Sequence, residues 1–507
     1  MVVGEDVERL VRKHHLVHLA ILLIIILGIG VYLIATTVLI AKDGVAYIEY
    51  AKQLAVEPAK AMRGTYLHPG YSFLIYIVNK LVGQFYGGTS LGSWIISAQS
   101  VSLLCKTIAT VVLYLIGSLL VGPRMSFWAV LILTILPDSA EYGSDALTDW
   151  PHIMFLVTGF WLLLLSVKSS KWQAFGFVGI IAGLGYLVRP ECCQLVIYGG
   201  GWLLLRLVRP QREMSRTRTV GCLISLLAGF AITAGPYMKF MGYVFPEHRI
   251  GSFARFVDMA DSNIDKIGMT SEYFAGFVPI ELAKGIWKFS SNIHESLIYY
   301  FVPALLIGIY YHFQKQARRE EKFFVPAFIL FNVVVLLWLY CKGGYISRRH
   351  TLPLVALTIF YVPIGLQLIS EWFARLFFRT DAETYWEKSK SQLCFLALIV
   401  IGMAICVHKL LEPMRTEKKG YRTAAKWLKE NTTEKALIAV PDRRIGFYAE
   451  RPMIVFDDRI PKGAKYIVKI VKDQDKSSTP YQSLHEEQSI YINERDKKDV
   501  LIIYKVM

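Results

Sequence analysis

Long apolar stretches alternate with short polar linkers along most of the chain. We predict eleven membrane spans, since a helix of about 20 residues crosses a hydrocarbon core roughly 30 Å thick. They are 16–41, 97–121, 125–137, 150–167, 172–188, 191–207, 219–237, 298–313, 323–341, 351–371 and 392–411. Another apolar stretch, 71–85, is short and interrupted by Asn79-Lys80, so we interpret it as an interfacial or re-entrant helix on the outer face.

The last part of the chain, 412–507, has a different pattern. The apolar face of an amphipathic helix is predicted over 421–431 by Ala424, Ala425, Trp427 and Leu428. Short runs typical of strands follow at 436–440, 453–456, 466–470 and 500–506. The pattern divides the chain into a membrane domain, 1–411, and a small soluble α/β domain, 412–507.

Composition agrees with a polytopic α-helical membrane protein. The 507 residues are 54% hydrophobic and 13% aromatic, and their mean hydropathy is +0.40. A soluble chain of this length cannot bury so much apolar surface. The seven cysteines show no metal-binding spacing, so we expect them to pack in the apolar core. The polar start, 1–15, lacks a small-residue cleavage site after the first apolar run and predicts an uncleaved signal anchor.

The net charge is +16, and the charged residues are distributed among the linkers in a way that fits the predicted spans. The linker 206–218 carries five arginines, whereas 138–149 has four acidic residues and no Lys or Arg. The positive-inside rule therefore predicts a cytoplasmic N-terminus, with the loops 42–96 and 238–297 and the soluble domain outside. No compact basic domain points to nucleic acid. Compact loops without eukaryotic sorting signals favour a bacterial inner membrane.

Asp43 lies two residues beyond the first apolar run. A carboxylate at the hydrocarbon boundary is costly unless it has a partner or a function, so Asp43 is a candidate general base. The alternative is a solvated residue at the end of the span. Tyr47 and His68 follow in the same outer loop and are candidate substrate contacts, although a lone histidine is more often structural.

A second acidic group lies in the loop 138–149. Its carboxylates would suit a cation, a set of sugar hydroxyls or an amine, or would keep the loop outside. Asp149 opens the next span, where water is scarce, and is the strongest candidate of this loop. Glu141 and Asp145 are further candidates for substrate binding.

The loop 342–350 holds Lys342, Arg348, Arg349 and His350, although its predicted side should be poor in cations. A phosphate group would explain them, because guanidinium binds phosphate oxygens bidentately. The alternative is snorkelling to lipid headgroups. Arg189 is a similar case, for which an ion pair with Glu191 is an equal explanation.

Six short segments together resemble the GT-C superfamily of membrane glycosyltransferases, in particular its protein O-mannosyltransferase and aminoarabinose-transferase branch. They occur in the family's order at 43–47, 68–71, 147–149, 187–191, 348–353 and 421–428. The resemblance extends over nearly the whole chain and rests on order and topology, since no single motif is strong. Gly44 stands where family members often have a second acidic residue, and Gly70 replaces a frequent proline.

The resemblance implies that a sugar passes, with inversion, from a polyprenyl-phosphate carrier to a lipid, glycan or protein acceptor. Asp43 would be the general base, and Arg348, Arg349 or Lys342 would stabilise the leaving phosphate. Asp149 would orient the acceptor or help to carry a divalent cation if one is used. Two alternatives remain: a transporter or flippase for a lipid-linked or anionic solute, and an oligosaccharide ligase or polymerase with a diphosphate donor. The sequence has no P-loop or hydrolase motif in a suitable setting.

Overall fold

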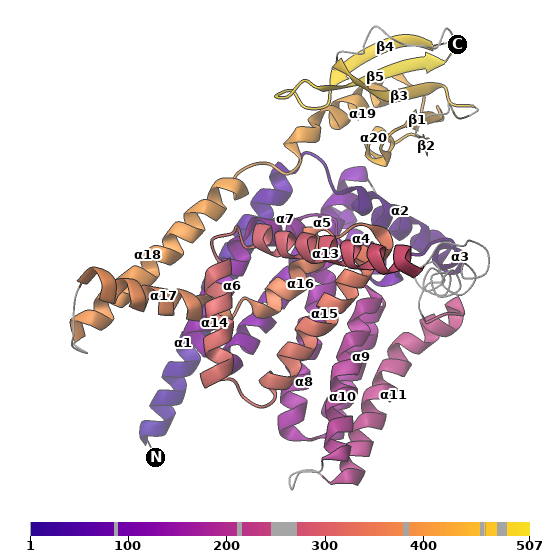
Figure 1. The fold of residues 1–507 in the computed structure, drawn as a ribbon. Coiled ribbons are helices and arrows are strands. Elements are labelled where there is room, and N and C mark those ends of the chain that lie inside the picture. The colour runs from indigo at the N-terminus through magenta and orange to yellow at the C-terminus, as the bar shows by residue number, and fades with distance from the viewer. Residues whose placement is uncertain are drawn as a thin grey trace.

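A bundle of helices carries a small sheet domain at one end (Figure 1). The computed structural model describes residues 2–85, 90–209, 215–244, 271–378, 385–456, 461, 463–473 and 484–506. The expected fold class, a helical polytopic membrane protein with a small C-terminal α/β domain, is confirmed.

Seven helices in the described part of the chain are long and apolar enough to cross a membrane, and a bent pair, Arg348–Thr358 with Tyr361–Leu376, would make an eighth span. The helices that carry these segments are α1 (Val2–Thr36), α5 (Leu91–Leu120), α8 (Asp149–Ser169), α10 (Gln194–Val208), α11 (Arg216–Met241), α15 (Glu321–Gly343), α16 (Arg348–Thr358), α17 (Tyr361–Phe378) and α18 (Tyr385–Leu410). The short 3₁₀ helix η1 (Pro190–Cys193) leads into α10.

The expected number of spans, eleven, is larger than the seven or eight that helix length and composition support. Every predicted stretch does fold as a helix. Three of these helices have only 13, 15 and 14 residues, namely α6 (Pro123–Ile135), α9 (Trp172–Tyr186) and α14 (Val302–Lys315). A straight helix of that length falls short of a bilayer's hydrocarbon thickness.

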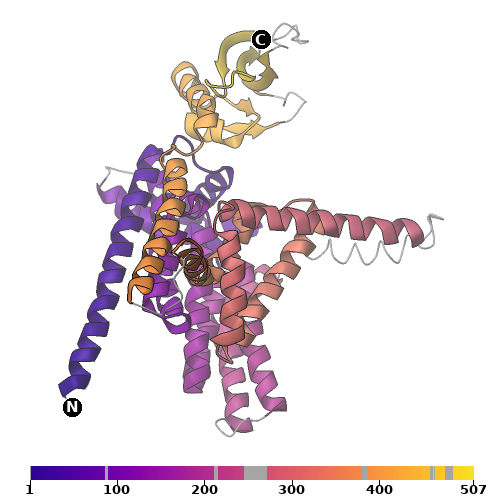
Figure 2. The ribbon, with the colours of Figure 1, turned by 60° about the vertical axis from the view of Figure 1, so that its left-hand side comes forward.

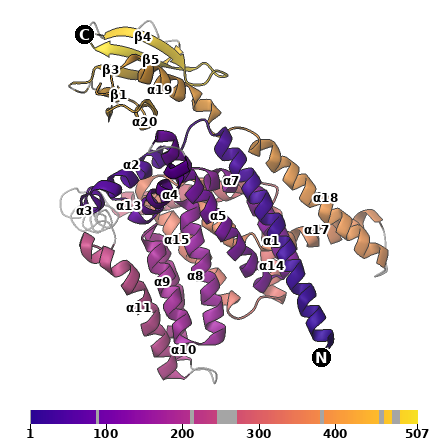
Figure 3. The same cartoon turned by 180° about the vertical axis from the view of Figure 1, so that it is seen from behind.

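The two ends of the bundle differ in what they carry. The N-terminus and the ends of α10 and α11 nearest the arginine-rich linker lie at one end (Figures 1 and 3). Shorter helices gather at the other end, below the sheet domain, and one long helix crosses the bundle there (Figure 2). They are α2 (Lys42–Val56), α3 (Pro58–Arg63), α4 (Pro69–Phe85), α7 (Pro137–Ser144) and the long α13 (Ser271–Ser296). The charge pattern places these same elements on two sides of the membrane, and which end faces outside stays a prediction. Much of the predicted outer loop 238–297 lies outside the described residues.

The C-terminal domain is a five-stranded mixed sheet covered by two helices. Its strand order is β2-β1-β3-β5-β4, with β1 parallel to β2 and β3, and β5 antiparallel to β3 and β4. Its elements are η2 (Thr416–Lys418), α19 (Lys419–Asn431), β1 (Ile438–Val440), α20 (Arg443–Ala449), β2 (Met453–Val455), β3 (Tyr466–Lys472), β4 (Leu484–Tyr491) and β5 (Asp499–Val506).

One buried apolar cluster joins this domain to the membrane domain. Val45 and Ile48 of α2 belong to the same cluster as Leu428 of α19 and Val468 of β3. Burial of such apolar surface contributes about 25 cal/mol for each Å² removed from water. The domain is therefore packed onto the helix that carries Asp43.

Candidate active site

Three helices begin with charged side chains that meet at the end of the bundle below the sheet domain. Asp43 lies in the first turn of α2, Asp149 opens α8, and Arg348 and Arg349 open α16. A helix N-terminus carries a partial positive charge, which favours carboxylates and disfavours arginines. The arginines at the start of α16 are therefore stabilised by acids from other helices.

Arg349 connects the two carboxylates that the sequence singled out. Its Nη1 donates to Asp43 Oδ2 at 2.7 Å and its Nε to Asp149 Oδ2 at 3.0 Å. The other oxygen of Asp149 accepts from Arg189 Nη2 at 3.0 Å, and Arg189 Nε donates to Thr148 Oγ1 at 2.8 Å. We call Asp43, Arg349, Asp149 and Arg189 the Arg349 network. Arg189 also interacts electrostatically with Glu191, so the pair expected from the sequence stands beside the bond to Asp149.

The two carboxylates of the Arg349 network differ in accessibility. The side chain of Asp43 is 56% exposed, whereas that of Asp149 is 1% exposed. A buried carboxylate needs paired and hydrogen-bonded partners, and Asp149 has two arginines. Asp43 is thus open to the surface, whereas Asp149 is enclosed and pairs with both arginines.

Arg348 points to a different set of acids. Its Nη1 lies 3.1 Å from Asp138 of α7, and its Nε lies 3.7 Å from Glu295 of α13. Ser296 Oγ donates to the other oxygen of Asp138 at 3.0 Å. Burial raises the pKa of Asp138, although Arg348 and Ser296 act in the opposite direction. Arg348 therefore ties α16 to α7 and α13, and neither it nor Arg349 simply snorkels.

Glu141 and Asp145 meet an arginine that the sequence reasoning missed. Arg415, beyond the last span, pairs with both acids and donates to the carbonyl of Leu39 at 3.0 Å. Burial raises the pKa of Glu141, with Arg415 acting in the opposite direction. We call Arg415, Asp145 and Glu141 the Arg415 network.

Asp145 fixes the backbone just before Asp43. Its Oδ1 accepts from the N–H groups of Ala41 at 3.1 Å and Ala146 at 2.8 Å. A carboxylate bound in this way by backbone donors and an arginine is strongly held. The Arg415 network therefore holds the backbone just before α2 at Leu39 and Ala41.

Two glycines of the expected motifs allow close approach between segments. A Cβ at Gly44 would lie 2.7 Å from Ala146 Cβ and 2.8 Å from its carbonyl oxygen. A Cβ at Gly70 would lie 2.7 Å from the carbonyl oxygen of Leu187, which accepts the Gly70 N–H at 2.7 Å. In this fold, the larger residue that relatives often have after the first Asp would collide with the loop around Ala146.

The remaining predicted contacts surround the Arg349 network in different ways. Tyr47 hydrogen-bonds to Thr148, and burial raises its pKa. His350 Nδ1 accepts from the Ser347 N–H at 3.1 Å, completing a capping box at the start of α16. His68 is buried beside Tyr186, with ring centroids 5.1 Å apart. Lys342 is exposed at the end of α15, its Nζ 4.8 Å from the centre of the Trp338 ring.

The structure shows where each of these four side chains lies, but it does not test what each one does. Tyr47 reaches the network through Thr148, and His350 shapes the helix that bears Arg349. His68 lies in an aromatic cluster, and Lys342 lies at the far end of the 342–350 loop. Their roles as substrate contacts stay predictions.

The described part of the chain offers no clear binding site for a metal ion. There, no group of three or more His, Cys, Asp and Glu side chains is arranged to hold an ion. Three acidic residues of the 138–149 loop form ion pairs with arginines, namely Asp138, Asp145 and Asp149. We therefore assign no step to a metal.

Known proteins share part of the sequence, or the fold, of this chain. Residues 69–236 match the family model of the dolichyl-phosphate-mannose-protein mannosyltransferases. ArnT from Cupriavidus metallidurans, solved with undecaprenyl phosphate, superposes with a TM-score of 0.53 at 13% identity, over 96% of this chain and 97% of that one. The oligosaccharyltransferase AglB from Archaeoglobus fulgidus, solved with an inhibitory peptide and a dolichol-phosphate, gives 0.57 at 13%, over 90% and 69%. No curated protein sequence matches the chain.

The resemblance to the GT-C glycosyltransferases that the sequence predicted is confirmed by the family match over residues 69–236, about a third of the chain. The structures at 13% identity show the shared fold. Asp43, Arg348 and Arg349 lie outside the matched residues 69–236, so their roles depend on the geometry of this chain.

Proposed function

We propose that the chain transfers a sugar from a polyprenyl-phosphate carrier to an acceptor on the outer side of the membrane, inverting the anomeric centre. The observation that carries this proposal is the Arg349 network, in which the exposed carboxylate of Asp43 is linked through Arg349 to the buried Asp149. The helix α2, which begins with Asp43, lies at the end of the bundle opposite the N-terminus (Figure 1). We assign that end to the outer side.

In this proposal Asp43 is the general base. It takes the proton from the acceptor nucleophile while that atom attacks the anomeric carbon and the bond to the phosphate oxygen breaks. The proton ends on Asp43, and the carrier leaves as a polyprenyl phosphate. Phosphate is a good leaving group, so no second carboxylate has to protonate it, in contrast to glycoside hydrolysis.

The start of α16 is the proposed phosphate site. Arg348 and Arg349 are partly exposed, with 34% and 23% of their side chains accessible. Helix N-termini favour anions, and those of α2, α8 and α16 converge here. Arg349 would stabilise the charge of the leaving phosphate while it remains anchored by Asp149. Lys342, at the other end of the same loop, is a further candidate for this contact.

Asp149 is a positioning residue in this proposal. Its side chain is too buried to meet the acceptor, and it holds Arg189 and Arg349 from either side. An isosteric Asp149→Asn change would remove the anion that the two arginines share, and Arg349 would keep only Asp43 as an ion-pair partner. We expect it to lower the rate of transfer mainly through the misplaced Arg349.

The experiment is the release of lipid phosphate by purified protein in nanodiscs, with the acceptor identified beforehand by mass spectrometry of envelope glycans from cells that lack the chain. We expect the wild type and the control Glu57→Gln, an exposed acid at the end of α2, to release polyprenyl phosphate. Asp43→Asn should release none above background. Full turnover by Asp43→Asn would remove the base assignment, and unchanged glycans in the deletion strain would contradict the transfer itself.

A further inference from the structure

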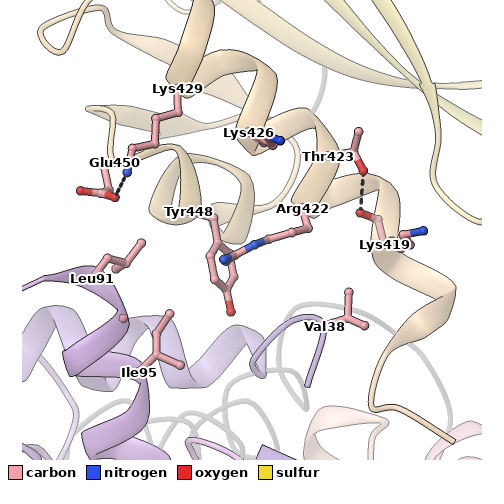
Figure 4. A pocket seen from close by; sticks show the side chains of 11 residues that line it. Val38, Leu91, Ile95, Lys419, Arg422, Thr423, Lys426, Lys429, Tyr448 and Glu450 are labelled. Carbon is pink, nitrogen blue, oxygen red and sulfur yellow. Dashed lines mark hydrogen bonds and ion pairs between the residues drawn. The ribbon is translucent and has the colours of Figure 1, made fainter. Parts of the chain in front are cut away.

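A cavity of about 650 Å³ lies between the C-terminal domain and the membrane domain. Its upper wall comes from α19 and α20, and its lower wall from Val38 and the first turns of α5 (Figure 4). It is separate from the Arg349 network, because none of the residues that line it belongs to that network.

The upper wall of the cavity is strongly basic. Lys419, Arg422, Lys426 and Lys429 are spaced so that they share one face of α19. Among the described residues that line the cavity, Glu450, which pairs with Lys429, is the one acid; Lys419 and Lys426 pair with Glu494 and Glu430 outside the lining. The guanidinium of Arg422 lies 4.0 Å from the centre of the Tyr448 ring and points into the space between the domains (Figure 4). The lining thus has a net positive charge.

The lower wall is apolar and belongs to a membrane span. Leu91 and Ile95 are in the first two turns of α5, and the apolar segment of that helix runs from Leu91 to Leu120. The base of the cavity therefore lies at the start of a helix that is long and apolar enough to cross a membrane. Basic groups above an apolar surface fit an anionic amphiphile better than a free anion, which gains nothing from Leu91 or Ile95.

We propose that this cavity binds the phosphate headgroup of an anionic membrane phospholipid, with its acyl chains along the start of α5. Basic clusters next to a span attract anionic lipid headgroups, and arginine binds phosphate oxygens bidentately. The proposal is independent of the sugar-transfer proposal, since it requires neither a donor nor Asp43.

A ligand bound in the cavity would be connected to the active site through one hydrogen bond. Tyr448, which carries the stacked Arg422, accepts the N–H of Ile40 at 3.1 Å through its hydroxyl. Ile40 stands three residues before Asp43. A bound headgroup would therefore fix the C-terminal domain over the segment from which α2 starts.

The test is photolabelling of the full-length protein in nanodiscs with a photoactivatable phosphatidylglycerol, followed by mapping of labelled peptides. The variant is Arg422→Gln/Lys426→Gln, and the matched control, with the same loss of charge on exposed residues outside the cavity, is Lys435→Gln/Lys498→Gln. We expect labelling of peptides around 91–95 and 419–429 to fall at least about fivefold in the variant and to stay unchanged in the control.

Three results would overturn the proposal: equal labelling of the double variant, equal labelling by a photoactivatable phosphatidylcholine, or loss of labelling on addition of millimolar inorganic phosphate. The last result would identify a site for a free anion. If the double variant does not fold, the single change Lys426→Glu at an exposed position gives the same comparison. Sugar transfer that fails in an otherwise labelled protein would leave this proposal intact.

Discussion

The Arg349 and Arg415 networks share a plan but differ in how exposed their acids are. In each, one arginine joins a buried carboxylate, Asp149 or Asp145, to a more exposed one, Asp43 or Glu141, and Glu141 is 37% exposed. The Arg349 network ends at Asp43, whose side chain is 56% exposed. The central acid of the Arg415 network, Asp145, has no exposed surface and also accepts two backbone N–H groups.

The difference separates a reactive carboxylate from a structural one. A carboxylate that is fully paired and buried has no lone pair free for a substrate proton and keeps the backbone in place. A carboxylate with one arginine partner and an open side can exchange that partner for a substrate. Among the acids of the two networks, the proposed base is the most exposed.

The largest effect is expected for Asp43→Asn. The change keeps the shape of the side chain and removes its basicity, and general bases contribute roughly 10²- to 10⁴-fold. We expect a loss of this size in the rate of polyprenyl-phosphate release, with thermal unfolding in detergent shifted by no more than about 2 °C, because an exposed ion pair contributes little. A large fall in the unfolding temperature would make Asp43 structural.

Arg349→Lys should have the next largest effect. A lysine keeps the charge but cannot bridge Asp43 and Asp149 with two separate N–H groups of a planar fork. We expect transfer to slow by roughly 10- to 100-fold, the size of effect produced by a misplacement of about 1 Å. A rate within twofold of the wild type would contradict the bridge.

Arg415→Gln should affect stability more than chemistry. It leaves Asp145 buried without its cation, which costs about 3–5 kcal/mol. The double variant Arg415→Gln/Asp145→Asn should recover part of that loss, because the uncompensated charge is gone. The measurement is the unfolding midpoint of the two single variants and the double variant. Strict additivity would show that the pair does not act as a unit.

Gly44→Ala tests how closely α2 must approach the loop around Ala146. The new methyl group would lie 2.8 Å from the Ala146 carbonyl oxygen, so the start of α2 has to shift. We expect a fall of about 10-fold in the rate of transfer. The control is Gly28→Ala, since a Cβ at Gly28 meets nothing within 4 Å; equal rates for both variants would contradict the packing account.

The smallest effect concerns pH and the C-terminal domain. Burial acts to raise the pKa of Asp442, but the hydrogen bonds from Arg444 outweigh it and hold the pKa below the ordinary value. The stabilisation is therefore present above about pH 4 and is lost as pH falls through the lowered pKa. We expect Asp442→Asn to lower the unfolding midpoint by a few degrees at pH 7 and to converge with the wild type near pH 3. A constant difference at both pH values would contradict this origin.

The sequence predicts most of the fold because hydrophobic periodicity determines most of its elements. Every predicted apolar stretch is a helix, and four of the five strands lie where short β-rich runs stand. The missed strand, β4, is an edge strand with the sequence Leu-His-Glu-Glu-Gln-Ser-Ile-Tyr. An exposed edge tolerates charges, so the alternation that marks other strands is absent. The predicted boundary at 411/412 stays a prediction.

The site is less predictable because its partners are far apart in the chain. Position and charge identify Asp43, Asp149, Arg189 and Arg349 as candidates. They do not predict that Arg349 bonds to Asp149 and Asp43, which lie 200 and 306 positions away in the chain. Arg415 was missed, although the same signal was available. It is a cation just beyond a span on the side predicted to be poor in cations, as are Arg348 and Arg349.

The central claim is that Asp43 removes a proton and does not merely bind substrate. The most direct test is Asp43→Ala supplied with donor and azide, an anionic nucleophile that needs no general base. We expect this variant to be inactive with the natural acceptor, and to form polyprenyl phosphate and a glycosyl azide of inverted configuration when azide is present. Failure of azide to restore lipid-phosphate release in a folded variant that still binds donor would contradict the account.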